Sequence, residues 1–129
     1  MIHEFRIYKL HPGKRQAFLE RFSKLTLPFF EKHGIRFLGF WEIGEVPAAS
    51  QPQASPGGVF RPAEGASFDQ EQIAYLVAFP DVTARDRAWA AFVADEGWRR
   101  TKAETEQEGP LVAEEDYFLL RTTIFSPLQ

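Results

Sequence analysis

Three polar side chains near the start of the chain could act together on a ligand. Glu4, Arg6 and Tyr8 alternate with other residues in segment 2–10, which is rich in Ile, Phe and Tyr and is predicted to form a β-strand. Alternate residues of a strand share a face, so the carboxylate, guanidinium and phenol should project together. A buried arginine between a carboxylate and a phenol could hold an anionic or carbonyl ligand.

Arg121 is a candidate fourth member of this cluster. It lies in the predicted last strand, which we expect to neighbour the first strand in an antiparallel sheet. An alternative is that Glu4 and Arg6 pair with each other inside an interface between two protomers and fix its register. We favour this alternative, because a charge that faces apolar strands needs a partner in any case.

A second group of candidates is aromatic. The side chains of Trp41, Tyr75, Trp89 and Trp98 could line a pocket between a sheet and its helices. The simpler interpretation, which we favour, is that they are core aromatics. The ligand-pocket candidates from both groups are Glu4, Arg6, Tyr8, Trp41, Tyr75, Trp89 and Arg121.

The sequence does not predict a metal centre or a known catalytic motif. His3 and His11 lie at opposite ends of the first strand, roughly 26 Å apart at ~3.3 Å per residue, and His33 falls at a helix end. Cysteine is absent, and no H-E-x-x-H spacing, Gly-rich phosphate loop or G-x-S-x-G motif occurs. We therefore expect no metal ion and no cofactor, and the motifs leave open whether the protein is an enzyme.

Composition limits the class of protein. The 129 residues suffice for one domain, and the 44% hydrophobic and 15% aromatic content is typical of a packed globular protein. A net charge of −3 without a Lys/Arg cluster argues against a nucleic-acid partner. No apolar run approaches the ~20 residues of a transmembrane helix, and the first residues do not resemble a signal peptide. We expect a cytoplasmic protein without membrane insertion.

The longest predicted element is an amphipathic helix over residues 12–34. Apolar residues from Phe18 to Phe29 recur at spacings of four, three and four, so they share one face. Charged residues, Arg21 among them, are assigned to the wet face. Pro28 lacks a backbone donor and should kink the helix or split off its final turn.

The rest of the chain is predicted to supply three strands and two further helices. Within the second strand, alternation places Phe37, Gly39 and Trp41 on one face and Phe40 on the other. The helix after the third strand should bury Trp89 and leave Arg85 in solvent. The predicted strands cover residues 35–43, 71–80 and 114–125, and the helices begin at Asp81 or Thr83 and at Asp95.

Residues 44–70 differ in kind from the rest. They are rich in Pro, Gly, Ala, Ser and Gln and show no periodicity, so they are predicted to form a long loop insertion within a single domain, residues 1–129. A long loop in a compact domain is either a functional lid or a disordered or tolerated insertion. We favour the insertion, since nothing in the segment has catalytic character.

The order of elements predicts an α+β fold with a four-stranded antiparallel sheet and helices on one face. Three of the strands carry large apolar side chains on both faces, whereas an antiparallel sheet with one wet face alternates apolar and polar residues more cleanly. No helix remains to cover the second face. We therefore predict a homodimer in which two sheets pack face to face.

Several segments, taken in order, resemble the NIPSNAP family, and the similarity covers the chain outside segment 44–70. The resemblance implies a ferredoxin-like homodimeric α/β barrel, in agreement with the argument from the sheet faces. The segments are Ile2-His3-Glu4-Phe5-Arg6-Ile7-Tyr8, Pro12-Gly13-Lys14, Leu27-Pro28, Glu31-Lys32-His33-Gly34, Gly39-Phe40-Trp41, Tyr75-Leu76-Val77-Ala78-Phe79-Pro80-Asp81 followed by Arg85 and Arg87, and Asp95-Glu96-Gly97-Trp98.

The chain departs from the family pattern at Tyr75 and Val77, where members often carry His and Trp, so a role for that His does not transfer. The family has no settled enzymatic activity, while the wider superfamily includes cofactor-independent monooxygenases and isomerases. The resemblance implies a homodimer that binds a small hydrophobic molecule or another protein. The alternative is a cofactor-independent monooxygenase or isomerase. A cavity of several hundred Å³ beside an unpaired Arg or Tyr would favour ligand binding or chemistry.

Overall fold

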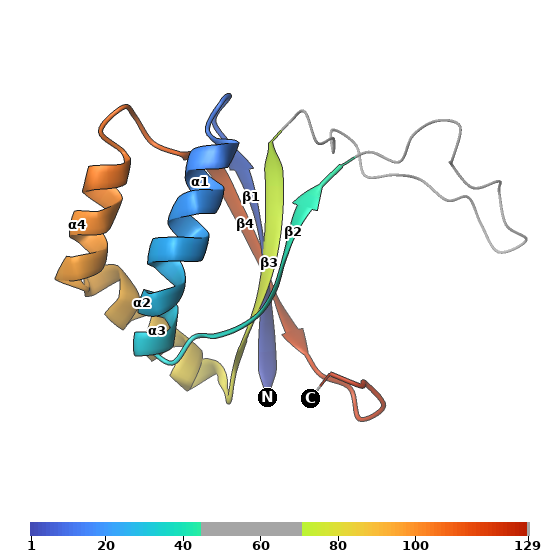
Figure 1. Cartoon of the computed structure of the whole chain (residues 1–129). Coiled ribbons are helices and arrows are strands. Elements are labelled where there is room, and N and C mark those ends of the chain that lie inside the picture. The colour runs from blue at the N-terminus through green and yellow to red at the C-terminus, as the bar shows by residue number, and fades with distance from the viewer. Residues whose placement is uncertain (45–70, 129) are drawn as a thin grey trace, which may run out of the picture.

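A computed structural model of the chain describes residues 1–44 and 71–128 and shows two layers, an open antiparallel sheet and a set of helices against one of its faces (Figure 1). The strand order is β2-β3-β1-β4. The predicted α+β class and the position of the last strand beside the first are confirmed. From residue 45 onward, the predicted insertion lies outside the described residues. The strands are β1 (Ile2–Leu10), β2 (Arg36–Ile43), β3 (Gln72–Phe79) and β4 (Val112–Arg121).

The first helical region is interrupted, as the proline predicts. The break is a π-helical segment in which the Leu27 N–H donates to the Phe22 carbonyl, directly before Pro28. Because Pro28 has no N–H, the carbonyl four residues earlier loses its usual donor, and the wider turn accommodates this loss. The helical elements are α1 (Arg15–Arg21), η1 (Phe22–Thr26), α2 (Leu27–Lys32), α3 (Val82–Ala94) and α4 (Glu96–Thr105).

Two aspartates fix the helical layer. Asp81 caps α3 by accepting a hydrogen bond of 2.7 Å from the Ala84 N–H. Asp95 caps α4, and its second carboxylate oxygen lies 2.7 Å from both Lys32 Nζ and His33 Nε2 at the end of α2. The contacts with Lys32 and His33 hold the pKa of Asp95 well below its usual range. The start of α4 is therefore tied to the end of α2.

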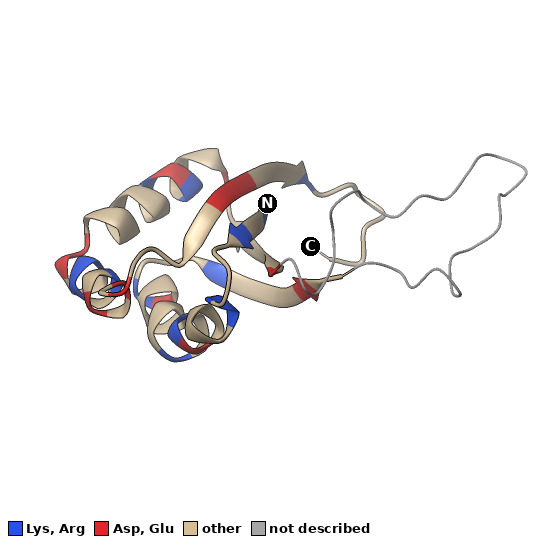
Figure 2. Cartoon of the chain, turned by 90° about the horizontal axis from the view of Figure 1, so that it is seen from above, with Lys and Arg blue, Asp and Glu red and all other residues tan. Residues whose placement is uncertain are grey.

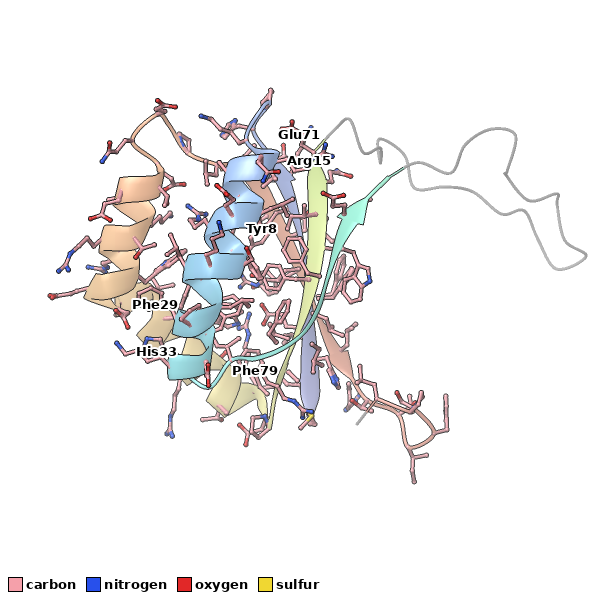
Figure 3. All side chains as sticks on the ribbon, in the orientation of Figure 1. Tyr8, Arg15, Phe29, His33, Glu71 and Phe79 are labelled. Atoms are coloured by element: carbon pink, nitrogen blue, oxygen red, sulfur yellow. The ribbon has the colours of Figure 1, made fainter. Side chains whose placement is uncertain are left out.

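An aromatic core fills the space between the layers. The β3 side chains of Ile73, Tyr75, Val77 and Phe79 all point into it and are almost fully buried. Phe22 of η1 packs with its ring centroid 5.0 Å from that of Tyr75. Figure 3 shows Phe79, and Tyr8 from β1, between the sheet and the helices.

The face assignment predicted for β2 is wrong at Phe37. Phe37 lies opposite Val77, but the next paired residue is Gly39, opposite Leu76, so Leu38 forms a bulge. The bulge places Phe37 and Phe40 on the same, helix-covered face, where both contact Phe22.

On the other face of β2, the ring of Trp41 lies across Gly39. A Cβ at Gly39 would lie only 2.7 Å from that ring, so this close approach requires glycine.

None of the helices in the described residues covers the outer face of the sheet (Figure 1). This face carries Trp41, Phe118 and Leu120, which are 48%, 54% and 44% exposed, and the Trp41 ring centroid lies 6.2 Å from that of Phe5. The helices, by contrast, carry charges of both signs (Figure 2). The structure therefore presents an exposed apolar sheet face opposite its helical layer.

Candidate functional site

The centre of the candidate site is the buried carboxylate of Glu4. It has no exposed surface, and it accepts hydrogen bonds from Arg6 Nε at 2.5 Å, Arg85 Nε at 2.6 Å and Trp89 Nε1 at 3.2 Å. The pairing of Glu4 with Arg6 that we favoured is present. Its predicted place between two protomers is wrong, because these side chains lie on the face that α3 covers.

Arg85 also departs from its predicted position in solvent. Its side chain is only 17% exposed, since Arg85 lies in the first turn of α3 and its guanidinium reaches Glu4 of β1. Burial opposes a charge on Glu4, but the hydrogen bonds from Arg85 and Arg6 outweigh it and hold the pKa of Glu4 below its usual value. The carboxylate is therefore ionised and has two cationic partners.

A series of hydrogen-bonded side chains leads from Arg6 into the core. Arg6 Nη1 donates to the Tyr8 hydroxyl at 2.9 Å, and the Tyr8 and Tyr75 hydroxyls lie 2.6 Å apart. Burial raises the pKa of both phenols, so both are protonated at neutral pH. The two phenols hold two protons and only one lies between them. Among the described residues, the other proton has no acceptor.

These groups form one wall of a cavity of about 430 Å³ between the sheet and the helices. Its exposed lining residues Val93, Lys102, Pro110 and Glu115 mark a mouth between the α3–α4 side and β4. Its inner surface is largely aromatic. The inner lining includes Tyr8, Phe18, Phe22, Phe30, Tyr75, Trp89, Phe92 and Trp98.

The predicted site residues divide between this cavity and other places. Arg6, Tyr8, Tyr75 and Trp89 line it, and Glu4 lies behind Arg6. Trp41 lies on the opposite face of the sheet, paired with Ala74, because the pleat of β2 directs it away from the helices. Trp41 is therefore not a pocket residue.

Arg121 does not join the cluster either. It lies opposite Ile2, whereas Tyr117 is the β4 residue opposite Arg6. The Arg6 guanidinium lies 5.4 Å from the centre of the Tyr117 ring and 4.1 Å from that of Trp89. Tyr117 and Arg121 are an even number of residues apart, so alternation along the last strand puts both on the face of Arg6. Only the pairing register between β1 and β4 shows that Tyr117 is the residue opposite Arg6.

Arg21 is a cavity residue that the sequence analysis placed on the wet face. Its side chain is 6% exposed and its guanidinium lies between the rings of Phe18 and Trp98, at 5.5 and 5.4 Å from their centres. Burial lowers the pKa of Arg21, and Glu106 partly offsets this effect. Arg21 follows Phe18 by three residues, so helical spacing alone could have placed it on the buried side.

The described residues offer no evident metal site. They contain no group of three or more His, Cys, Asp and Glu side chains that could hold a metal ion. None of the helices in the described part of the chain combines the length and apolar character needed to cross a bilayer.

Comparison with known proteins gives a consistent result. The NIPSNAP family model matches residues 3–49 and 47–127. A NIPSNAP-like domain protein from Burkholderia xenovorans is 21% identical, with a TM-score of 0.67 over 98% of this chain and 88% of that one. No curated protein matches.

Two NIPSNAP family proteins from Agrobacterium tumefaciens have similar structures. One is 19% identical, with a TM-score of 0.68 over 100% of this chain and 94% of that one. The other is 17% identical, with a TM-score of 0.69 over 99% and 98%. At these identities the likeness concerns the fold alone.

Proposed function

The chain belongs to the NIPSNAP family, and from that premise we propose that it is a homodimeric small-molecule-binding domain that takes its ligand into the cavity between sheet and helices. The observation that carries this proposal is that, within the part of the chain that the structure describes, one phenolic proton of the Tyr8–Tyr75 pair in the wall of that cavity has no acceptor. A buried donor without an acceptor is costly, and a ligand oxygen would satisfy it.

The size and lining of the cavity also support ligand binding. A volume of about 430 Å³ lies within the range of ~300–1,000 Å³ that is usual for small-molecule sites. The walls combine aromatic rings with a few polar groups, which suits a mostly apolar molecule that carries a carbonyl or another acceptor.

A cofactor-independent monooxygenase or isomerase is the second candidate. The observation in its favour is the hydrogen-bonded series of Arg6, Tyr8 and Tyr75, which could donate to an oxyanion that develops on a bound substrate. Proton abstraction would also need a base at this point. The raised pKa of both phenols makes them donors, and Glu4 is held by two arginines. We therefore favour binding over catalysis.

The homodimer is proposed from the outer face of the sheet. Trp41, Phe118 and Leu120 form an exposed apolar surface there, and a second sheet is a partner of matching shape and chemistry. The face and the cavity lie on opposite sides of the sheet, so dimerisation leaves the cavity available.

Native mass spectrometry and calorimetry test both parts of this proposal. We expect a dimer, carrying a co-purified small mass or binding naphthalene-1-acetamide as a neutral probe. Val93→Trp should block the cavity mouth and abolish probe binding. Ala94→Trp, at the next exposed residue and outside the cavity lining, should not. A monomer would refute the dimer, and a protein that carries no added mass and binds no probe would refute the ligand site.

A further inference from the structure

Arg21 lines the cavity, and its guanidinium group contains a buried donor that is not used. Among the described residues, none accepts a hydrogen bond from its Nε, which has almost no accessible surface. Among the described residues that line the cavity, it is the only fully buried side-chain nitrogen or oxygen of this kind. A guanidinium nitrogen cannot give up its proton in a protein, so the unmet requirement is for an acceptor.

The protein partners of Arg21 do not fully compensate its charge. Nη1 donates to Thr105 Oγ1 over a long 3.4 Å and lies 3.6 Å from Glu106 Oε1. That same Glu106 oxygen already accepts the Leu111 N–H at 3.2 Å. The guanidinium is thus buried between two aromatic rings, with a distant, shared counter-charge on Glu106 and a smaller long-range contribution from Glu115. This arrangement is unfavourable unless an anion completes the site.

The other charges of the cavity do not remove this requirement. Arg6 shares the Glu4 carboxylate with Arg85, which also pairs with Asp86, and Lys102 adds a further cation on the α4 side of the mouth. Glu115 also lines the cavity, but it is exposed on β4 and forms no ion pair within the described part of the chain. The wall formed by α1 and α4 therefore favours an anion.

A purely structural role for Arg21, as a brace between α1 and α4, explains less. Its contact with Thr105 and its stacking on the rings of Phe18 and Trp98 would serve such a brace. A brace does not account for the unpaired Nε, because an apolar side chain of similar length could stack there without burying a charge.

We propose that the ligand is a small carboxylic acid with an apolar body, bound with its carboxylate against the guanidinium group of Arg21 in the cavity wall. The apolar body would lie among the rings of Phe22, Phe30 and Trp89, which line the inner cavity. Guanidinium and carboxylate form charge-assisted hydrogen bonds, which are stronger than neutral ones. This inference rests on the proposed ligand-binding function and specifies its ligand class.

A matched pair of probes tests the inference in the wild-type protein. Naphthalene-1-acetate and naphthalene-1-acetamide have nearly the same shape and differ in charge. Isothermal titration calorimetry at pH 7 should show the acid binding at least tenfold more tightly than the amide. Equal binding of the two probes would overturn the carboxylate inference and leave the ligand-binding function standing. Binding of neither would refute both.

Variants then assign the preference to Arg21. Arg21→Met keeps the length and stacking of the side chain but removes the charge and the N–H donors, so the acid should weaken to the level of the amide. Arg100→Met removes an exposed cation of α4 that lies outside the cavity lining and serves as the matched control, with the preference retained. A preference for the acid that survives in Arg21→Met would overturn the assignment to Arg21. If Arg21→Met does not fold, the wild-type comparison still decides the ligand class.

Discussion

Replacing Glu4 by glutamine should destabilise the fold more than any other conservative change of a charged residue in the sheet. The amide has nearly the shape of the carboxylate and can still accept the Trp89 N–H. It cannot compensate the guanidinium charges of Arg6 and Arg85, both of which donate to Glu4 at 2.5–2.6 Å. Its NH₂ group would also face one of those donors.

The geometry sets the expected cost of Glu4→Gln. Removing one partner of a buried ion pair typically costs ~3–5 kcal/mol, because the remaining charge stays buried without compensation. The side chains of Arg6 and Arg85 keep 16% and 17% of their surface exposed, so water can solvate them in part. We therefore expect a loss near the lower end, ~3 kcal/mol of unfolding free energy, or roughly 10 °C in Tm for a chain of this size.

Urea unfolding followed by circular dichroism measures this loss, with Glu114→Gln as the control. Glu114 is exposed on β4, and its substitution should change the free energy of unfolding by less than ~0.5 kcal/mol. The wild type, Glu4→Gln and Glu114→Gln must have similar m-values, so that a change in the free energy of unfolding reflects the folded state.

The pH dependence supplies a second, independent check. The pKa of Glu4 is lower in the folded state than its ordinary value of 4.5, so below about pH 4.5 the unfolded chain takes up the proton first. The contribution of Glu4 is complete above that pH and is lost as pH falls through the folded-state pKa. The difference between wild type and Glu4→Gln should therefore shrink from pH 6 to pH 3. A loss below ~1 kcal/mol, or a difference independent of pH, would refute the reasoning.

Further changes test the core, the bulge, the outer face and the insertion. Phe22→Ala should cost ~3–5 kcal/mol in urea unfolding, since its ring contacts five aromatic neighbours in the core; a loss under ~1 kcal/mol would contradict that packing. Gly39→Ala should lower Tm and change Trp41 fluorescence, and an unchanged spectrum would contradict the close contact. Phe118→Asp should convert the proposed dimer to a monomer in analytical ultracentrifugation while leaving the far-ultraviolet circular dichroism intact; a persistent dimer would place the interface elsewhere. Replacing residues 44–69 by a short turn should leave a folded dimer, because the adjoining ends of β2 and β3 are paired, and loss of the dimer would show that the segment is structural.

Much of the fold follows from local patterns. The alternation in 2–10 places Glu4, Arg6 and Tyr8 on one face, and the structure keeps them there because side-chain direction in a regular strand depends only on parity. The missing N–H of Pro28 likewise predicts the helix break from covalent structure alone. These results depend on interactions within a few residues, and the sequence contains all of that information.

Parity does not say which of two faces the helices will cover. The sequence therefore determined that Glu4 and Arg6 would pair, whereas only the tertiary structure decided that the pair lies beneath α3 with Arg85. The bulge at Leu38 arises from the pairing of β2 with β3, which the sequence pattern of β2 does not contain. It moved Phe37 to the face opposite the predicted one. Arg21 in turn became a cavity residue only when Trp98 packed against it. Such contacts join residues that are distant in the chain, and packing selects among arrangements that the local pattern allows equally.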